Sequence, residues 1–159
     1  MVSEAIWSRG SFGKVKVRIK RLPGFKGEIP QYATVGSSGM DVRACLDEEV
    51  VLDPGQRQLI PTGLSLEIPQ GYEIQVRPRS GLAISRGLTL LNTPGTVDAD
   101  YRGELKVIAV NLGQEPIHIQ DQERIAQLVV CPVIHAQIEE VEDLTETERG
   151  EGGFGSTGV

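Results

Sequence analysis

The chain has 159 residues, enough for one ordinary domain, and 39% of them are hydrophobic, enough to fill a single core. A net charge of −6 argues against nucleic acid as a partner, and no apolar stretch has the length of a membrane span. Two distant cysteines, Cys45 and Cys131, and only two histidines argue against a structural zinc site. We therefore expect a cytoplasmic protein with no nucleic-acid and no membrane partner.

The chain opens with residues 1–13, which we expect to form an N-terminal extension of a single domain that runs to residue 147. Charged and apolar residues then alternate over residues 14–20, which predicts a strand with its charges in water. A nucleic-acid-binding patch is the alternative interpretation of that stretch. The same period of two residues predicts further strands at residues 64–68, 72–76 and 104–107.

Turn signals separate these segments, at residues 23–24, 54–55, 70–71, 94–95 and 111–113. Residues 80–85 are the best candidate for a helix, and that helix would be short. Many short strands, frequent turns and little helix predict an all-β fold, a jelly-roll-like β-sandwich or barrel.

Two clusters contain more polar and charged side chains than a turn requires. In residues 77–81, two arginines, a serine and a glycine could hold phosphate oxygens, although a solvated strand end has the same composition. In residues 92–103, an amide, two carboxylates, a phenol and a guanidinium surround a Pro-Gly turn. An ordinary hairpin loop would explain that second cluster equally well if it stood alone.

Two further features lie near the end of the chain. Gln127 interrupts an apolar strand, residues 124–130, so its amide must bond either to backbone or to a ligand. Residues 148–159 are rich in glycine, and we expect this tail to be mobile. Phe154 has no core to join in such a tail, so it either stacks on a flat ligand or belongs to an inert terminus.

Taken in order, these features resemble the five motifs of the homotrimeric dUTPase family. The matching segments are Ser38-Gly39-Met40-Asp41-Val42, Arg79-Ser80-Gly81-Leu82-Ala83, residues 92–103, Arg124-Ile125-Ala126-Gln127-Leu128 and the glycine-rich tail. The first departs from the more familiar Ala-Gly-aromatic-Asp-Leu. Each motif is weak alone, but five in the right order between residues 14 and 158 are specific.

The resemblance implies a jelly-roll subunit in a homotrimer whose active sites are shared between chains. It also implies a dUTP diphosphatase, which converts dUTP to dUMP and pyrophosphate, limits uracil incorporation into DNA and supplies dUMP for dTMP synthesis. Asp98 is implied as the base that activates the water attacking the α-phosphate. Mg²⁺ is expected to arrive on the triphosphate without a direct protein ligand, with Asp41 supporting its water shell.

The same resemblance implies the substrate contacts. Recognition of uracil and deoxyribose is implied for Asn92, Gly95, Thr96, Val97 and Tyr101. Phosphate contacts are implied for Arg79, Ser80, Gly81 and Gln127, and Lys106 is a further implied substrate contact. Closure of the lid is implied for Arg149, Phe154, Gly155, Ser156, Thr157 and Gly158, with Phe154 stacked on uracil.

Three alternatives remain at this stage. A dCTP deaminase, or a bifunctional deaminase and dUTPase, shares the fold and several motifs. A non-catalytic nucleotide-sensing or partner-binding module is the second alternative, and a structural jelly roll such as a coat-protein domain is the third. Ammonia release from dCTP would favour the deaminase over the diphosphatase.

Overall fold

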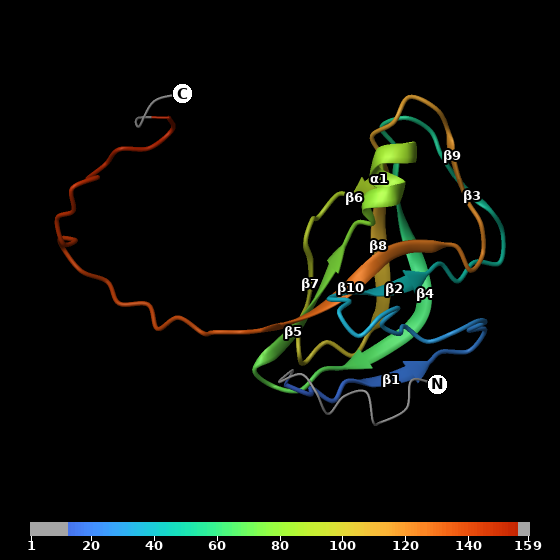
Figure 1. Ribbon diagram of the computed structural model, residues 1–159, viewed down its shortest axis with the longest axis horizontal. Helices are drawn as coiled ribbons and strands as arrows, with labels where there is room; N and C mark the ends of the chain where they lie inside the picture. The colour runs from blue at the N-terminus through green and yellow to red at the C-terminus, as the bar shows by residue number, and fades with distance from the viewer. Residues whose placement is uncertain (1–12, 156–159) are drawn as a thin grey trace.

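The computed structural model describes residues 13–155, and strands dominate this part of the chain (Figure 1). One antiparallel sheet has the order β1 (Arg18–Arg21), β4 (Arg57–Glu67), β8 (Glu104–Asn111), β6 (Leu88–Leu90). The second has the order β2 (Met40–Arg43), β10 (Arg124–Pro132), β5 (Tyr72–Arg77), β7 (Gly95–Val97). A third, two-stranded sheet pairs β3 (Val50–Leu52) with β9 (Ile117–Ile119). The predicted all-β, jelly-roll-like class is confirmed.

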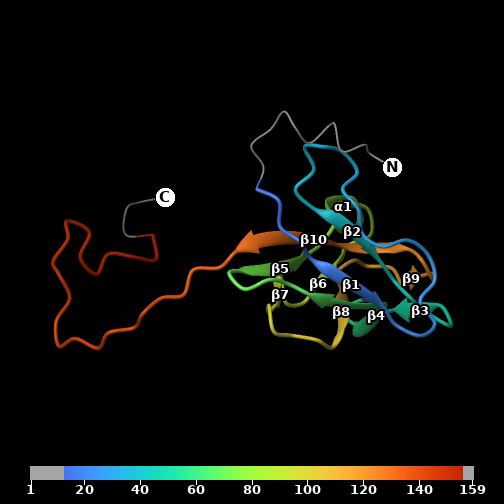
Figure 2. The same cartoon turned by 90° about the horizontal axis from the view of Figure 1, so that it is seen from below.

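The two larger sheets form two layers with one hydrophobic core between them (Figure 2). Leu66 of β4 and Leu105 of β8 are 3% exposed, and Ile74 of β5 and Leu128 of β10 are 1% exposed. Buried and more exposed positions alternate along β5 and the first half of β8, because successive side chains point to opposite faces, whereas residues 62–66 of β4 are all buried. Burial of one such side chain stabilises the fold by about 1.5–3 kcal/mol. The core therefore holds the polar side chains between these buried positions pointing outward.

The strands predicted at residues 64–68, 72–76 and 104–107 are confirmed in β4, β5 and β8. The strand predicted from residue 14 was too long, because β1 begins only at Arg18. Arg18 pairs with Glu67, the last residue of β4, so the same register would place Lys16 opposite Pro69. Proline has no N–H to donate, and the ladder therefore stops.

The short helix α1 (Ser80–Arg86) confirms the helix expected at residues 80–85. It ends at Gly87, whose φ of 69° is left-handed. A Cβ at Gly87 would lie only 2.4 Å from the backbone nitrogen of Gly113, so the close approach of these two loops also requires glycine. None of the helix residues is buried, and α1 serves to end β5 at a polar surface.

Beyond β10 the chain runs away from both sheets (Figure 1). We call the described residues 133–155 the arm. Its large apolar side chains are open to solvent, with Ile134 94%, Ile138 87% and Leu144 86% exposed. The predicted division into a domain of residues 1–147 and a lid of 148–159 stays a prediction. No helix among residues 13–155 is long and apolar enough to cross a membrane.

Candidate active site

One row of polar residues crosses the second sheet. Gln127 of β10 pairs with Asp41 of β2 on one side and with Arg77 of β5 on the other. Residues opposite one another on neighbouring strands project from the same face of a sheet. The register therefore brings the first, second and fourth motifs, which are far apart in the sequence, to one end of this sheet.

The Asp41 carboxylate binds two arginines in this row. Arg79 donates from Nε to Oδ1 of Asp41 at 2.9 Å, and Arg124 Nη1 lies 3.4 Å from Oδ2. Arg79 also donates from Nη1 to the Arg124 carbonyl at 3.2 Å. One carboxylate thus holds two guanidinium groups near the start of α1, where Ser80 and Gly81 are exposed. Two guanidinium groups beside the free N–H groups of a helical first turn are suited to phosphate oxygens.

The Gln127 amide is hydrogen-bonded to backbone, which is one of the two possibilities that the sequence left open. Its Nε2 donates to the Pro78 carbonyl at 2.9 Å. Its Oε1 occupies the space above Gly39, where an added Cβ would lie only 2.3 Å away. Gly39 of the first motif is therefore needed to seat the amide of the fourth. We call Gly39, Asp41, Arg79, Arg124 and Gln127 the arginine cluster.

The third motif lies at the opposite edge of this sheet, on and after β7. Gly95 and Val97 are buried, whereas Thr96 is exposed, as alternation along the strand requires. A Cβ at Gly95 would lie 3.1 Å from Nδ2 of Asn92, so the amide of Asn92 packs directly over the Gly95 backbone. The structure thus places these four predicted base-reading residues in the loop between β6 and β7 and on β7, which we call the β7 segment; β6 and β7 belong to different sheets, so this segment is not a β-hairpin.

Tyr101 closes the loop after β7. Its hydroxyl donates to the Glu104 carbonyl at 2.9 Å, and its ring lies so close to Gly103 that an added Cβ would be 2.4 Å from the hydroxyl oxygen. Arg102 donates from Nη1 to the Ala99 carbonyl at 2.6 Å. These bonds hold Tyr101, which stays 47% exposed.

Asp98 is exposed at the start of this loop. Its carbonyl accepts from the Tyr101 N–H at 3.2 Å, but its carboxylate has no hydrogen-bond or ion-pair partner among residues 13–155. It lines a pocket of about 990 Å³, which we call the Asp98 pocket. Four carboxylates and two basic or titratable nitrogen groups line this pocket: Glu67, Glu73, Asp98, Asp100, Arg102 and His135.

The Asp98 carboxylate and the arginine cluster lie far apart within one chain. Val97 pairs with Ile74, so Asp98 follows at the level of Glu73, whereas Arg79 lies two residues beyond the other end of β5. Six residues of strand correspond to roughly 20 Å at ~3.3 Å per residue. Within one copy, Asp98 and the arginine cluster therefore lie at opposite ends of β5.

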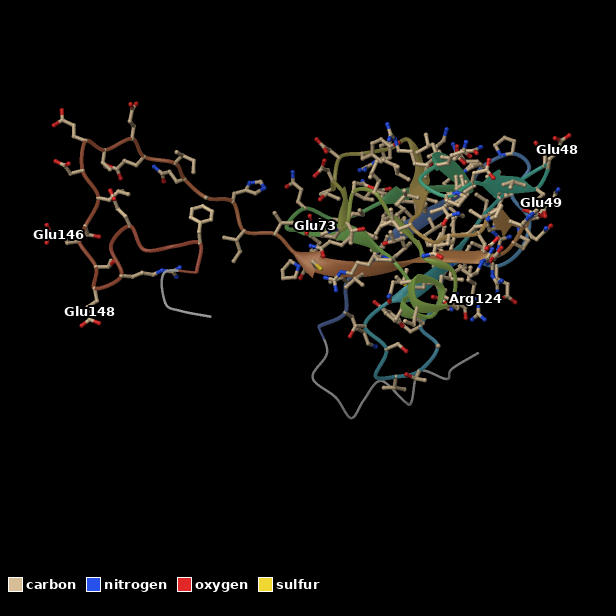
Figure 3. The ribbon with its side chains drawn as sticks, turned by 90° about the horizontal axis from the view of Figure 1, so that it is seen from above. Glu48, Glu49, Glu73, Arg124, Glu146 and Glu148 are labelled. Carbon is tan, nitrogen blue, oxygen red and sulfur yellow. The ribbon has the colours of Figure 1, made fainter. Side chains whose placement is uncertain are left out.

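The described lid residues lie on the arm, away from both groups (Figure 3). Arg149 donates from Nε to the Gly152 carbonyl at 2.7 Å, Phe154 is fully exposed, and Gly155 has a φ of 89°. Ser156, Thr157 and Gly158 lie outside the described residues. Lys106 is exposed on β8, with its Nζ 3.5 Å from Oε2 of Glu104, and it does not line the Asp98 pocket.

A family model described as dUTPase matches residues 26–158. The chain belongs to the dUTPase family. The deoxyuridine 5'-triphosphate nucleotidohydrolase of Bdellovibrio bacteriovorus is 65% identical over 145 residues, which cover 91% of this chain and 97% of that protein. Among solved structures, the Staphylococcus bacteriophage 80alpha dUTPase with dUPNHPP superposes with a TM-score of 0.81 at 28% identity, covering 91% of this chain and 99% of that one.

A third match extends the structural comparison. A mutant dUTPase of phage phi11 of S. aureus, described with a structural Mg(II) ion, superposes with a TM-score of 0.72 at 22% identity. The match covers 80% of this chain and 97% of that one and supports the fold alone. The family assignment confirms the resemblance carried by the five motifs and identifies the chain as an enzyme of the nucleotidohydrolase class.

The structure adds contacts that the sequence did not predict. Arg124 was noted only as part of the fourth motif, yet it binds Asp41 together with Arg79. Tyr72, Glu73 and His135 were not predicted to approach Asp98, but all three line its pocket. Only the pairing register and the path of the chain after β10 bring these side chains together, and neither can be read from residue spacing.

Proposed function

We propose that this chain hydrolyses dUTP to dUMP and pyrophosphate, and that Asp98 activates the water that attacks the α-phosphate. The observation that carries this proposal is the exposed Asp98 carboxylate, which has no partner among residues 13–155, directly follows the β7 segment and lines a large pocket. A carboxylate without a bound cation is free to accept a proton from water. Membership of the dUTPase family supports the choice of substrate.

In this proposal the β7 segment and Tyr101 select the substrate. Asn92 and the backbone of Gly95, Thr96 and Val97 hydrogen-bond the edge of uracil, and cytosine would leave those groups unpaired. Tyr101 packs against the deoxyribose and leaves no room for a 2′-hydroxyl. The packing of Asn92 on Gly95 and of Tyr101 on Gly103 supports these roles, because it fixes both side chains before substrate arrives.

The arginine cluster holds the phosphates. Arg79, the first turn of α1 at Ser80 and Gly81, and the Gln127 amide contact the phosphoryl oxygens, with Lys106 as an additional proposed substrate contact. The tail then closes over the triphosphate through Arg149, Gly155, Ser156 and Thr157, while Phe154 stacks on uracil. Closure excludes bulk water and aligns the attacking water with the departing pyrophosphate.

The donor groups fit Mg²⁺ carried by the triphosphate. Mg²⁺ prefers oxygen ligands and retains water, and bound there it would neutralise charge on the departing pyrophosphate. Across residues 13–155, no three His, Cys, Asp or Glu side chains form a metal cage. Both oxygens of Asp41 face arginines, so this carboxylate supports the hydrated ion from outside, while the carboxylates of the Asp98 pocket can accept hydrogen bonds from its waters.

The active enzyme in this proposal is a homotrimer with active sites shared between chains. The separation of Asp98 from the arginine cluster supports sharing, because the base of one copy and the phosphate-binding arginines of another must meet. Two inactive variants, Asp98→Asn and Arg79→Ala, test this directly when they are co-expressed with different tags. Each purified mixed trimer should regain one of its three sites, because only one of its neighbouring pairs joins an intact Asp98 to an intact Arg79. No recovery in purified mixed assemblies would contradict sharing.

The reaction is tested by pyrophosphate release from dUTP, dCTP, dTTP and UTP, with and without Mg²⁺. We expect release from dUTP in the presence of Mg²⁺ and little from the other three nucleotides. Ammonia release from dCTP would instead identify a deaminase, and nucleotide binding without turnover would identify a sensing module. In the cell, the proposed reaction would take place in the cytoplasm, limit uracil incorporation into DNA and supply dUMP for dTMP synthesis.

A further inference from the structure

The carbonyl that holds the Tyr101 ring belongs to Glu104, the first residue of β8. The Tyr101 hydroxyl donates to this carbonyl at 2.9 Å, and the same hydroxyl lies closely against Gly103. Because nearly half of the tyrosine side chain is open to solvent, packing alone does not fix the ring. The position of Tyr101 therefore depends on where the backbone of Glu104 lies.

The pairing of β8 with its neighbour β4 is irregular at this point. On one side of the irregularity Pro61 pairs with Lys106, and on the other Ser65 pairs with Glu104. Three residues of β4 therefore lie opposite the single residue Leu105 of β8. A bulge of this kind interrupts the regular ladder of backbone hydrogen bonds, so the start of β8 needs other bonds to hold its place.

Two side chains supply bonds across the bulge. Thr62 Oγ1 donates to the Leu105 carbonyl at 2.6 Å, and Oε1 of Glu104 accepts from the Gly63 N–H at 2.9 Å. Gly63 has a φ of 68°, the left-handed conformation that glycine often adopts at a bulge. Because Gly63 is buried, loss of the carboxylate would leave its N–H without this partner, which is costly.

The point to which Glu104 is attached is itself held in place. The Gly63 carbonyl accepts from the Leu22 N–H at 2.9 Å, so this residue bonds to the chain on both sides. A Cβ at Gly63 would lie 3.0 Å from Sγ of Cys45, which shows how closely the bulge is packed. Glu104 thus connects a packed bulge, through its carboxylate, to the exposed Tyr101 ring, through its carbonyl.

The same carboxylate also faces Lys106. The lysine Nζ lies 3.5 Å from Oε2 of Glu104, and the two side chains are 41% and 24% exposed. An ion pair that is open to solvent contributes little to stability, so the bond to the buried Gly63 N–H is the one that fixes Glu104. Substitution by glutamine separates the two contacts, because an amide oxygen still accepts from the N–H but no longer attracts the lysine.

We infer that Glu104 is a positioning residue for Tyr101 and that it thereby sets how strongly the site prefers a deoxyribonucleotide over a ribonucleotide. This inference rests on the proposed function, in which the Tyr101 ring excludes a 2′-hydroxyl. Exclusion of one hydroxyl group requires a ring that does not yield. Release of Glu104 from the bulge should therefore admit UTP, while dUTP, which does not press on the ring, is still hydrolysed.

Kinetics with the two nucleotides test the inference. We call the ratio of kcat/KM for dUTP to kcat/KM for UTP the sugar selectivity. Glu104→Ala should lower it about three- to ten-fold, whereas Glu104→Gln should retain it. Asp121→Ala is the matched control, because it removes a carboxylate bond to a backbone N–H elsewhere, that of Leu46 at 2.8 Å, and should leave the sugar selectivity unchanged.

Two outcomes of this experiment would overturn the inference. One is an unchanged sugar selectivity in folded Glu104→Ala, and the other is an equal loss in Glu104→Gln, which would assign the effect to Lys106. If Glu104→Ala does not fold, Glu104→Asp replaces it, because a side chain shorter by one methylene keeps the charge but draws it away from Gly63. That variant should also lose selectivity, and an unchanged ratio would be equally decisive.

A double-variant cycle tests whether Glu104 acts through the tyrosine. Tyr101→Phe removes the hydroxyl that Glu104 holds. In that background Glu104→Ala should lower the sugar selectivity no further, because the two residues share one interaction. Losses that multiply independently would show that Glu104 acts by another route, which is the result expected of a merely structural residue.

A measurement without substrate separates this inference from the proposed function. The chain has three tyrosines, so their ring signals can be followed by NMR after ¹³C labelling, and Tyr101→Phe identifies the signal of Tyr101. Glu104→Ala should shift that signal and leave those of Tyr32 and Tyr72 in place. A shift in a chain whose wild type does not hydrolyse dUTP would refute the proposed function and leave the positioning role standing. Hydrolysis of dUTP with an unmoved Tyr101 signal would refute the inference alone.

Discussion

The two polar regions of the second sheet differ in how complete they are within one chain. In the arginine cluster, Asp41 binds Arg79 and Arg124, and Gln127 is seated on Gly39. In the Asp98 pocket, the Asp98 carboxylate has no partner among residues 13–155 and lies in a lining with three other carboxylates. The arginine cluster is organised within a single chain, before substrate or a second copy binds. The Asp98 pocket is lined by carboxylates and needs cations from outside this chain.

This difference indicates that phosphate binding and turnover depend on different regions of the chain. The arginine cluster needs only the fold of its own copy, so its geometry depends on β2, β10 and the start of α1. The Asp98 pocket concentrates negative charge, which opposes binding of a triphosphate unless Mg²⁺ or basic side chains from elsewhere enter with it. Changes in the first region should therefore act on phosphate binding, and changes in the second on turnover.

The largest effect is expected for Asp98→Asn, which removes the base without changing the shape of the pocket. We expect kcat to fall by about 10³-fold, while the Kd for dUTP changes little. Steady-state pyrophosphate release and calorimetric binding measure the two quantities. Asp100→Asn is the matched control, because Asp100 is an exposed carboxylate in the same pocket. Near-normal turnover of the Asp98 variant would remove its assignment as the base.

Deletion of residues 148–159 is expected to have the next largest effect. It removes Arg149 and Phe154 but no part of the buried core, so kcat/KM should fall by about 10²-fold with the melting temperature unchanged. Kinetics and thermal unfolding measured on the same preparation separate the two outcomes. A fully active truncated enzyme would refute the lid.

A smaller effect is expected for Asp41→Asn, which weakens the attachment of two arginines. The remaining amide oxygen can still accept from one of them, so we expect kcat/KM to fall by only about ten-fold, mostly through a higher KM. Glu49→Gln, at an exposed carboxylate 3.0 Å from Nδ1 of His118, is the control. A fall in kcat with unchanged KM would place Asp41 in the chemical step instead.

The smallest effect concerns stability, at a carboxylate outside both regions. The backbone N–H of Leu46 donates to Asp121, and this bond, with a contribution from Gln122, lowers the pKa of Asp121 below 3.8. A lowered pKa stabilises the fold above pH 3.8, and this contribution is lost as the pH falls through the lower, folded-state value. Asp121→Asn should therefore destabilise the protein at pH 7 by at most about 1 kcal/mol, because solvent screens the site.

Thermal unfolding of wild type and Asp121→Asn between pH 7 and roughly pH 2.5 measures this contribution. The difference in melting temperature should be largest at neutral pH and should shrink as the pH falls below 3.8. A difference that grows in acid would contradict the sign. Turnover at pH 7 should stay unchanged, since Asp121 lines neither the Asp98 pocket nor the arginine cluster.

The fold class and the family could be predicted because their signals are local. Alternation in residues 64–68 and 72–76 indicates which side chains face the core. The order of the five motifs can be read from the sequence without knowing any contact. The binding of Arg124 to Asp41 could not be predicted, because it depends on the register between β2 and β10. The beginning of β1 at Arg18 was missed for a similar reason, since Pro69 limits its partner strand from far along the sequence.

The substrate contacts of several residues stay predictions, because they depend on groups outside a single chain. The contacts of Asn92, Lys106 and Arg149 with substrate depend on a ligand and on other copies of the chain. Only their positions on the β7 segment, on β8 and on the arm are fixed by a single copy. The mixed-assembly experiment addresses this gap directly, because it reads the geometry between chains.

The charge balance of the chain up to Pro132, which contains fifteen acidic and fifteen basic residues, has a practical consequence for handling the protein. The acidic isoelectric point, about 5.0, comes from the segment after Pro132. A proteolytic cut between Pro132 and Glu139 would leave a neutral portion that binds an anion-exchange resin at neutral pH far more weakly. Elution position on such a column therefore reports, before any assay, whether a preparation still carries its arm.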